Sequence, residues 1–209
     1  MRREVDLVVP VKTLDRAKTR LLGAADHGLG DPTAHAALAL ALALDTITAA
    51  TKAVRQVVAV TSDPAVVAEL RALGIESLPG PDGLNPALHH AAAVLRTRDP
   101  HSVIGALQAD LPALKPDDLT AALEAAADQR AFCPDRQGTG TTLLLSAPGH
   151  PLSPHFGLGS AEAHQASGAI PLLGPWHSLR TDVDTPEDLT LATTLGLGPR
   201  TSALLPVCH

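Results

Sequence analysis

The stretch that decides the fold class is Val5-Asp6-Leu7-Val8-Val9-Pro10-Val11-Lys12, in which a short apolar run ends at a proline and a lysine. A run of this length and composition, closed by proline, is typical of a buried β-strand. Similar runs follow at residues 56–61, 75–78 and 103–109. Between them lie segments that favour helix, at residues 34–50, 64–72, 86–97 and 119–127. Because strands and helices alternate, the sequence predicts an α/β protein with a mixed, mainly parallel, Rossmann-like sheet and helices on both faces.

The helix at residues 34–50 has a clear beginning. Asp31 is a good N-cap, and Pro32 suits the first helical position because its missing N–H would have no partner there. Leucines alternate with alanines along part of this segment, which would normally suggest a strand. Every residue of that part is apolar, however, and alanine and leucine are strong helix formers, so we expect a buried helix.

The second half of the chain follows a different pattern. Strand-like runs at residues 131–134 and 141–146 flank a turn, which predicts a β-hairpin insertion. We expect a last strand that ends at Asp184, followed by a helix whose capping box begins at Thr185. The 209 residues fit one domain, residues 1–209, with a flexible tail from about residue 198.

Composition excludes several classes of function. The net charge is −6 and aromatic residues make up 1% of the chain, so it has neither the basic surface nor the stacking platforms that nucleic-acid binding requires. Cys133 and Cys208 are too far apart to suggest a disulfide framework or a zinc site. The longest apolar run, residues 36–44, is much shorter than the roughly 20 residues that span a bilayer. We therefore expect a cytoplasmic protein without membrane contact, in which the helix at 34–50 and the hairpin could support a homodimer.

Three aspartates are candidate metal ligands. Asp110 ends the run at 103–109, and Asp182 and Asp184 lie two positions apart, so in an extended segment they face the same side. Neighbouring carboxylates repel one another unless a cation lies between them, and three of them suit a hard ion such as Mg²⁺. The alternative is structural: Asp110 would cap a helix, and the other two would lie in a turn. Spacing alone does not choose between these interpretations.

A basic segment follows the first strand, where ligands bind in open α/β sheets. Lys12, Lys18 and Arg20 could line a triphosphate site, because ammonium and guanidinium groups both suit phosphate oxygens. An ordinary solvated loop is the alternative. Neither a Walker-type P-loop nor a GxGxxG turn after a strand is present, so those nucleotide sites lack their motifs.

Two glycine-containing turns could bind an anion. The turn at residues 138–142 offers backbone N–H groups and hydroxyls, and Gly157 and Gly159 precede a predicted helix start at Ser160. Each could also be a simple hairpin turn or helix cap. His164 and two further histidines lack matching metal ligands, so we interpret them as surface or capping residues.

These segments together resemble the 2-phospholactate and phosphoenolpyruvate guanylyltransferases of coenzyme F420 biosynthesis, a branch of the MobA-like nucleotidyltransferases. The resemblance extends over nearly the whole chain, and its motifs occur in the expected order. They are Val9-Pro10-Val11-Lys12, Ala17-Lys18-Thr19-Arg20-Leu21, Gly83-Leu84-Asn85, Gln108-Ala109-Asp110-Leu111-Pro112, Asp135 with the 138–142 turn, Phe156-Gly157-Leu158-Gly159-Ser160 with His164, and Asp182-Val183-Asp184-Thr185-Pro186-Glu187-Asp188-Leu189.

The resemblance implies a nucleotide-diphosphosugar-transferase-like fold and an enzyme that joins GTP to a small phosphorylated three-carbon acid. It implies that Mg²⁺ binds at Asp110, Asp182 and Asp184, that Lys12, Lys18, Arg20 and Asp110 are catalytic, and that Asn85 lies beside the nucleotide. The acid would bind near Thr142, Gly157 and Ser160.

Two positions depart from many relatives and bear on the acceptor. Thr142 stands where many have asparagine, and Ala161 stands where some have phenylalanine. Threonine at this turn favours phosphoenolpyruvate over 2-phospholactate. A MobA-like enzyme with another phosphorylated acceptor, or a catalytically silent nucleotide-binding protein, are the alternative functions.

Overall fold

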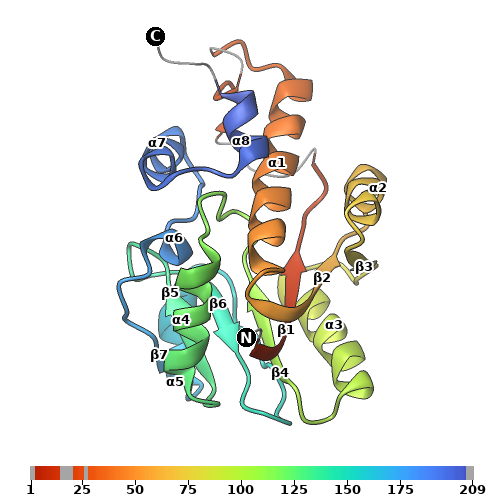
Figure 1. Ribbon diagram of the computed structural model, residues 1–209, viewed down its shortest axis with the longest axis vertical. Coiled ribbons are helices and arrows are strands. Elements are labelled where there is room, and N and C mark those ends of the chain that lie inside the picture. The colour runs from red at the N-terminus through yellow and green to blue at the C-terminus, as the bar shows by residue number, and fades with distance from the viewer. Residues whose placement is uncertain (1–2, 15–20, 26–27, 206–209) are drawn as a thin grey trace.

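The computed structural model describes residues 3–14, 21–25 and 28–205, which form a seven-stranded sheet with helices packed on it (Figure 1). The strands are β1 (Arg3–Pro10), β2 (Val54–Val60), β3 (Glu76–Leu78), β4 (Val103–Leu107), β5 (Ala131–Pro134), β6 (Thr141–Leu145) and β7 (Ile170–Pro171). The helices are α1 (Pro32–Ala50), α2 (Pro64–Ala72), α3 (Leu84–Arg98), α4 (Pro116–Ala126), α5 (Ser160–Ala166), α6 (His177–Arg180), α7 (Pro186–Leu195) and α8 (Pro199–Leu204).

The strand order is β3-β2-β1-β4-β6-β5-β7, and β1 lies near the middle. Within β1, Val8 pairs in parallel with Val58 of β2 on one side and with Ala106 of β4 on the other. The hairpin strands then join the same sheet, with β6 antiparallel to both β4 and β5. The predicted mixed, mainly parallel sheet and its hairpin are therefore confirmed.

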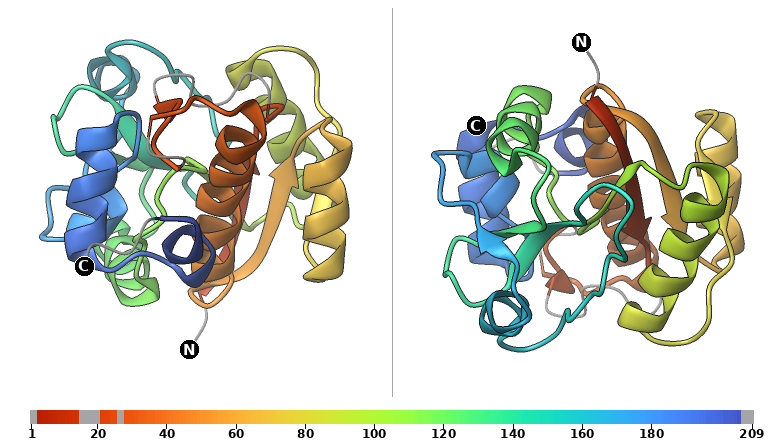
Figure 2. Two further views of the ribbon diagram at one scale, coloured as in Figure 1. Left: turned by 90° about the horizontal axis from the view of Figure 1, so that it is seen from above. Right: turned by 90° about the horizontal axis from the view of Figure 1, so that it is seen from below.

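Both faces of the sheet are covered by helices, as the two views in Figure 2 show. Leu7 and Val9 of β1 pack with residues of α1, α2 and α4 on one face. Val8 packs with residues of α3 and α5 on the other face. Because successive side chains of a strand point to opposite faces, burial on both sides explains why β1 is almost continuously apolar.

Helix α1 begins as the sequence predicted. Asp31 caps it by accepting a hydrogen bond of 3.0 Å from the N–H of Thr33, and Pro32 is its first residue. In the described part of the chain, α1 is the one helix long and apolar enough to cross a membrane, but 61% of its apolar window is buried inside the fold. Leu38, Leu42 and Ile47 are fully or almost fully buried, so α1 packs as a core helix.

The C-terminal part differs from the sequence prediction in three places. The expected last strand is wrong: the four-residue helix α6 comes first, and residues 181–185 that follow are irregular. The short strand β7 was not predicted. The expected tail from residue 198 contains the short helix α8, where the N–H of Thr201 donates to Asp45 of α1 at 2.8 Å, and its flexibility stays a prediction. The capping box of α7, between Thr185 and Asp188, is confirmed.

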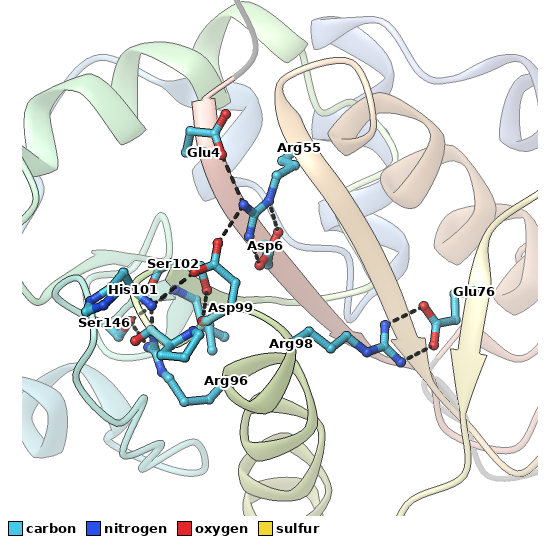
Figure 3. A network of polar contacts seen from close by, with 12 residues as sticks. Glu4, Asp6, Arg55, Glu76, Arg96, Arg98, Asp99, His101, Ser102 and Ser146 are labelled. Carbon is cyan, nitrogen blue, oxygen red and sulfur yellow. Dashed lines mark hydrogen bonds and ion pairs between the residues drawn. The ribbon is translucent and has the colours of Figure 1, made fainter.

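An ion network joins the amino ends of the central strands, at the opposite end of β1 from Pro10 (Figure 3). Asp6 of β1 is fully buried, and Arg55 of β2 donates to its carboxylate from Nε at 2.8 Å. Arg55 also contacts Glu4 at 3.0 Å and Asp99 at 2.7 Å. The hydrogen bond to Asp6 is the largest cause that raises the pKa of Arg55. Arg55 is therefore the guanidinium that is hydrogen-bonded to the buried carboxylate, while Arg96 and Arg98 interact with it only through longer-range charge attraction.

We expect Arg55→Ala to lower the free energy of unfolding by about 3–5 kcal/mol, because it leaves the buried Asp6 carboxylate without its cation. The matched control is Arg98→Ala. Its pair with Glu76 is solvent-exposed, with 41% of each side chain accessible, so its loss should cost less than about 1 kcal/mol. Urea unfolding of both variants measures the difference. Equal losses would contradict this account of the network.

Candidate active site

The carboxyl ends of β1 and β2 border a cavity of about 400 Å³. One wall comes from the residues that follow these strands, and the other comes from the loop between β3 and α3 together with the start of α3. Its lining residues are Pro10, Val11, Lys12, Thr13, Val60, Thr61, Ser62, Gly80, Pro81, Asp82, Gly83, Leu84 and Ala87. Ligands of open α/β sheets bind at this end of the strands, so the cavity is the candidate nucleotide site.

Gly80 keeps the floor of this cavity open. A Cβ atom at residue 80 would lie 2.6 Å from the Val60 side chain and 3.2 Å from the Cβ of Ala87, which is too close for the first contact. A larger residue would therefore have to push β2 and α3 apart. Glycine at this position allows the loop to pass closely over the end of β2.

Lys12 is the one predicted loop cation that the structure describes. It is exposed, and it lines the cavity directly after β1. Lys18 and Arg20 lie outside the described residues. The backbone around Lys12 is fixed on both sides, because the N–H of Val11 donates to the carbonyl of Val60 at 2.9 Å and the N–H of Leu14 donates to Asp63 at 2.9 Å.

The three predicted aspartates meet beyond the end of β4. The N–H of Val183, which lies between Asp182 and Asp184, donates to the carbonyl of Asp110 at 3.0 Å. This bond joins two segments that are far apart in sequence. The prediction that they converge at one edge of the sheet is therefore supported by the backbone geometry.

The electrostatics of this cluster are unfavourable for three charges. Burial is the main cause that raises the pKa of Asp182 to about 7, and the neighbouring charges of Asp110 and Asp184 raise it further. Such a group favours a cation, because a bound cation would compensate both for the lost hydration of Asp182 and for the repulsion from its neighbours. Among residues 3–14, 21–25 and 28–205, no three acidic, histidine or cysteine side chains are already gathered as a metal site. The donor set fits a hard cation, and the carboxylates would have to draw together around it.

Thr46 of α1 fixes the segment that carries Asp110, and the sequence analysis did not identify it. Its buried hydroxyl accepts the N–H of Leu111 at 2.9 Å and lies 3.2 Å from the carbonyl of Ala109. It therefore contacts the backbone on both sides of Asp110. The sequence shows Thr46 only as one of three threonines in a largely apolar helix, so no local signal singles it out.

Asn85, predicted to lie beside the nucleotide, is hydrogen-bonded to the loop before α5. Its carboxamide donates to the carbonyl of Phe156 at 2.9 Å and accepts the N–H of the same residue at 2.8 Å. Asn85 follows Gly83 and Leu84 of the cavity wall, so this pair of hydrogen bonds connects the wall to the loop before α5. Its observed contacts are those of a side chain that positions the loop.

The predicted acceptor residues lie close to one another along the hairpin and the start of α5. Thr142 is 1% exposed, and its hydroxyl donates to the carbonyl of Cys133 at 3.4 Å. Gly157 is exposed and has a φ of 142°, a conformation that favours glycine. The N–H of Ser160 already donates to the carbonyl of Gly157 at 3.1 Å. In this conformation neither the Thr142 hydroxyl nor the Ser160 N–H is presented to solvent as an open anion donor.

His164 connects these acceptor segments, so its interpretation as a surface residue was wrong. It is fully buried, its Nε2 accepts the N–H of His155 at 2.9 Å, and its Nδ1 lies 2.9 Å from the hydroxyl of Thr141. Acceptance at Nε2 requires that the proton of the neutral ring is on Nδ1. Burial is the main cause that lowers the pKa of His164 to about 4, and the charge of Arg130 lowers it further.

We expect His164 to make the protein less stable in mild acid. An unfolded histidine titrates near 6.5, whereas the folded one stays neutral down to about 4, so stability is lost as the pH falls below 6.5. At pH 5 the loss from this residue is about 2 kcal/mol. Urea unfolding at pH 7.5 and pH 5 should show a smaller pH dependence in His164→Asn than in the wild type. Equal pH dependence in both proteins would contradict this role.

Comparison with known proteins places this geometry in a family. The family described as CofC-like guanylyl transferases matches this chain over residues 5–201. The chain is 51% identical to the phosphoenolpyruvate guanylyltransferase of Geodermatophilus obscurus, over 97% of this chain and 94% of that protein. It is 53% identical to the enzyme of the same name from Streptomyces scabiei, over 94% of each chain.

Solved structures show the same fold at low sequence identity. A 4-diphosphocytidyl-2C-methyl-D-erythritol synthase superimposes with a TM-score of 0.59 at 13% identity, covering 93% of this chain and 99% of that chain. A cytidylyltransferase from Leptospira borgpetersenii superimposes with a TM-score of 0.55 at 15% identity, covering all of both chains. The family match spans nearly the whole chain, and the relatives are about half identical, so this nucleotidyltransferase belongs to the family of CofC-like guanylyl transferases.

Proposed function

We propose that this protein transfers the guanylyl group of GTP to the phosphate of phosphoenolpyruvate, with release of pyrophosphate. Two observations carry the proposal: the meeting of the Asp110 segment with the segment of Asp182 and Asp184, and a cavity lined by Lys12 at the carboxyl end of β1, the parallel neighbour of β4. The names of the relatives, which cover most of this chain, support the donor and the acceptor. 2-Phospho-L-lactate is the alternative acceptor, and the resemblance to guanylyltransferases of coenzyme F420 biosynthesis suggests a place in that pathway, in the cytoplasm.

The reaction needs alignment of two anions more than it needs a base. The acceptor is a phosphate monoester whose second pKa is near 6, so it is already mostly ionised at neutral pH. One of its oxygens attacks the α-phosphorus of GTP, and the bond from that phosphorus to the β-phosphate bridge breaks as pyrophosphate leaves. His164 is buried and occupied by structural hydrogen bonds, which agrees with a mechanism that uses no general base.

Two groups of residues would neutralise the negative charge of the phosphates: the cations at the cavity, and the aspartates through the metal that they would hold. Lys12 at the cavity supplies a positive charge for the phosphates of GTP and for the departing pyrophosphate. Asp110, Asp182 and Asp184 would hold Mg²⁺, which when bound neutralises phosphate oxygens as charge builds up in the transition state. The sequence also offers Lys18 and Arg20 for the same phosphates, outside the described residues.

The acceptor would lie against the hairpin and the loop before α5. Gly157 is exposed there, and the space beside its Cα is open, so a ligand can approach its backbone closely. Thr142 and Ser160 form the buried layer beneath, so their hydroxyls contribute to acceptor binding only if this loop opens slightly when the acid binds. The bond from Asn85 to Phe156 ties that loop to the nucleotide cavity, which would bring donor and acceptor together.

The function is tested by mixing the purified protein with Mg²⁺ and GTP, and adding phosphoenolpyruvate, 2-phospho-L-lactate or 3-phosphoglycerate in parallel. We expect the diphosphate-linked guanosine product from phosphoenolpyruvate, detected by mass spectrometry, with stoichiometric pyrophosphate. When ATP or CTP replaces GTP, neither a diphosphate-linked product nor pyrophosphate should form. Product from another phosphorylated acceptor would favour a MobA-like enzyme of different specificity, and GTP binding without pyrophosphate release would favour a silent nucleotide-binding protein.

The metal assignment is tested by Asp182→Asn. The substitution removes one charge from a repulsive cluster, so in chelator we expect a melting temperature about 2–4 °C higher than in the wild type, as a gain of about 1 kcal/mol would give. Mg²⁺ should stabilise the wild type but not the variant, and turnover should fall at least 100-fold.

The control for this test is Glu76→Gln. Glu76 forms an exposed ion pair with Arg98 at 2.7 Å, so its substitution should change stability by less than about 1 kcal/mol and leave the response to Mg²⁺ intact. Near-normal turnover of Asp182→Asn, or equal stabilisation of that variant by Mg²⁺, would contradict the metal assignment.

A further inference from the structure

Asp63 makes contacts on two sides, which its role as a helix cap does not explain. It precedes α2 and caps that helix, since its Oδ1 accepts the N–H of Ala65 at 2.9 Å and that of Val66 at 3.3 Å. Its Oδ2 points the other way and accepts the N–H of Leu14 at 2.9 Å. One carboxylate oxygen therefore serves the helix, and the other serves the basic segment after β1.

The hydrogen bond from Leu14 also stabilises the charged form of the Asp63 carboxylate. The hydrogen bond from Leu14 is the largest cause that lowers the pKa of Asp63, ahead of the bonds from the helix. The backbone at Asp63 is also held in place, because its N–H donates to the hydroxyl of Thr61 at 3.2 Å. The carboxylate therefore accepts three backbone N–H groups from two segments, α2 and the residues that follow β1.

The backbone of Lys12 and Thr13 is consequently fixed at both ends. On one side the N–H of Val11 donates to the carbonyl of Val60 at 2.9 Å, and on the other the N–H of Leu14 donates to Asp63. Lys12 and Thr13 line the nucleotide cavity between these two points. Because a lysine side chain is long and flexible, the position of its backbone largely decides which volume its ammonium group can reach.

We propose that Asp63 is a positioning residue for GTP binding: it holds the Lys12–Leu14 segment so that the Lys12 ammonium faces the phosphates. This inference rests on the proposed function, and it extends it to a residue that touches neither substrate nor metal. A neutral cap would not replace Asp63. Serine has a single short side-chain oxygen for the helix, and asparagine has one acceptor oxygen in place of two.

The experiment measures GTP binding apart from chemistry, by calorimetry of the full chain with Mg²⁺ and GTP and without an acceptor. Serine is a good N-cap, so Asp63→Ser should keep α2 folded while it loses the bond to Leu14. We expect the dissociation constant for GTP to rise about tenfold. In steady-state assays KM for GTP should rise, whereas KM for the acceptor should stay within about twofold of the wild type.

The matched control is Ala68→Gly, which lies exposed within α2 and weakens the helix by roughly 1 kcal/mol without contact to Leu14. It should lower the melting temperature about as much as Asp63→Ser and leave GTP binding unchanged. If Asp63→Ser folds poorly, Asp63→Asn gives the same test, because its amide nitrogen cannot accept the N–H of Leu14 while its oxygen caps the helix.

The two possible failures are distinct. If the wild type binds GTP and both Asp63 variants bind it equally well, or if Ala68→Gly weakens GTP binding to the same extent, Asp63 has no positioning role and the proposed function is untouched. If the wild type itself shows no affinity for GTP, the proposed function is wrong, and the role of Asp63 is wrong with it.

Discussion

The hydrogen bond between the N–H of Val183 and the carbonyl of Asp110 is the constraint on which the site depends. It joins two irregular segments and thereby places Asp110 beside Asp182 and Asp184, although their charges oppose such an approach. The opposing energy must be supplied by the surrounding fold. Thr46 contributes by binding the backbone on both sides of Asp110 from within the buried helix α1. At the other end of the sheet, the Asp6–Arg55 network holds β1 and β2 together. The strands that support the site are therefore cross-linked, which helps them to resist the repulsion between its carboxylates.

The two halves of the site are also linked through a single side chain. The carboxamide of Asn85 follows the cavity wall in sequence and makes both of its described hydrogen bonds with the backbone of Phe156. His164 then connects the same loop to the hairpin through His155 and Thr141. A displacement of the cavity wall must therefore move the loop before α5. For a reaction between two anions this matters, because a small change in their alignment strongly affects the rate.

Strong local patterns predicted most of the fold correctly. The buried run before Pro10, the Asp31-Pro32 helix start and the hairpin were all predicted, because each follows from neighbouring residues. The expected strand before Asp184 failed, because Asp182 and Asp184 alternate like strand residues but the N–H of Val183 finds a loop carbonyl and no ladder. The same limit applies to the site. Asp110, Asp182 and Asp184 were candidates from their chemistry, whereas the roles of Thr46 and His164 depend on contacts with distant segments that no local pattern encodes.

Four of the described aspartates differ from Asp182 in what surrounds the carboxylate. Asp6 faces a guanidinium, Asp45 accepts N–H groups at the start of α8, and Asp63 and Asp188 accept N–H groups at the starts of α2 and α7. In each of these the fold supplies donors that stabilise the negative charge. Asp182 is the opposite case, because burial and neighbouring carboxyl groups raise its pKa to about 7. The fold provides donors for these structural aspartates, yet it places acidic groups near Asp182, where ionisation is unfavourable and a cation would relieve the cost. Residual destabilisation of this kind is a physical reason to assign function to Asp182, and it does not depend on resemblance to any relative.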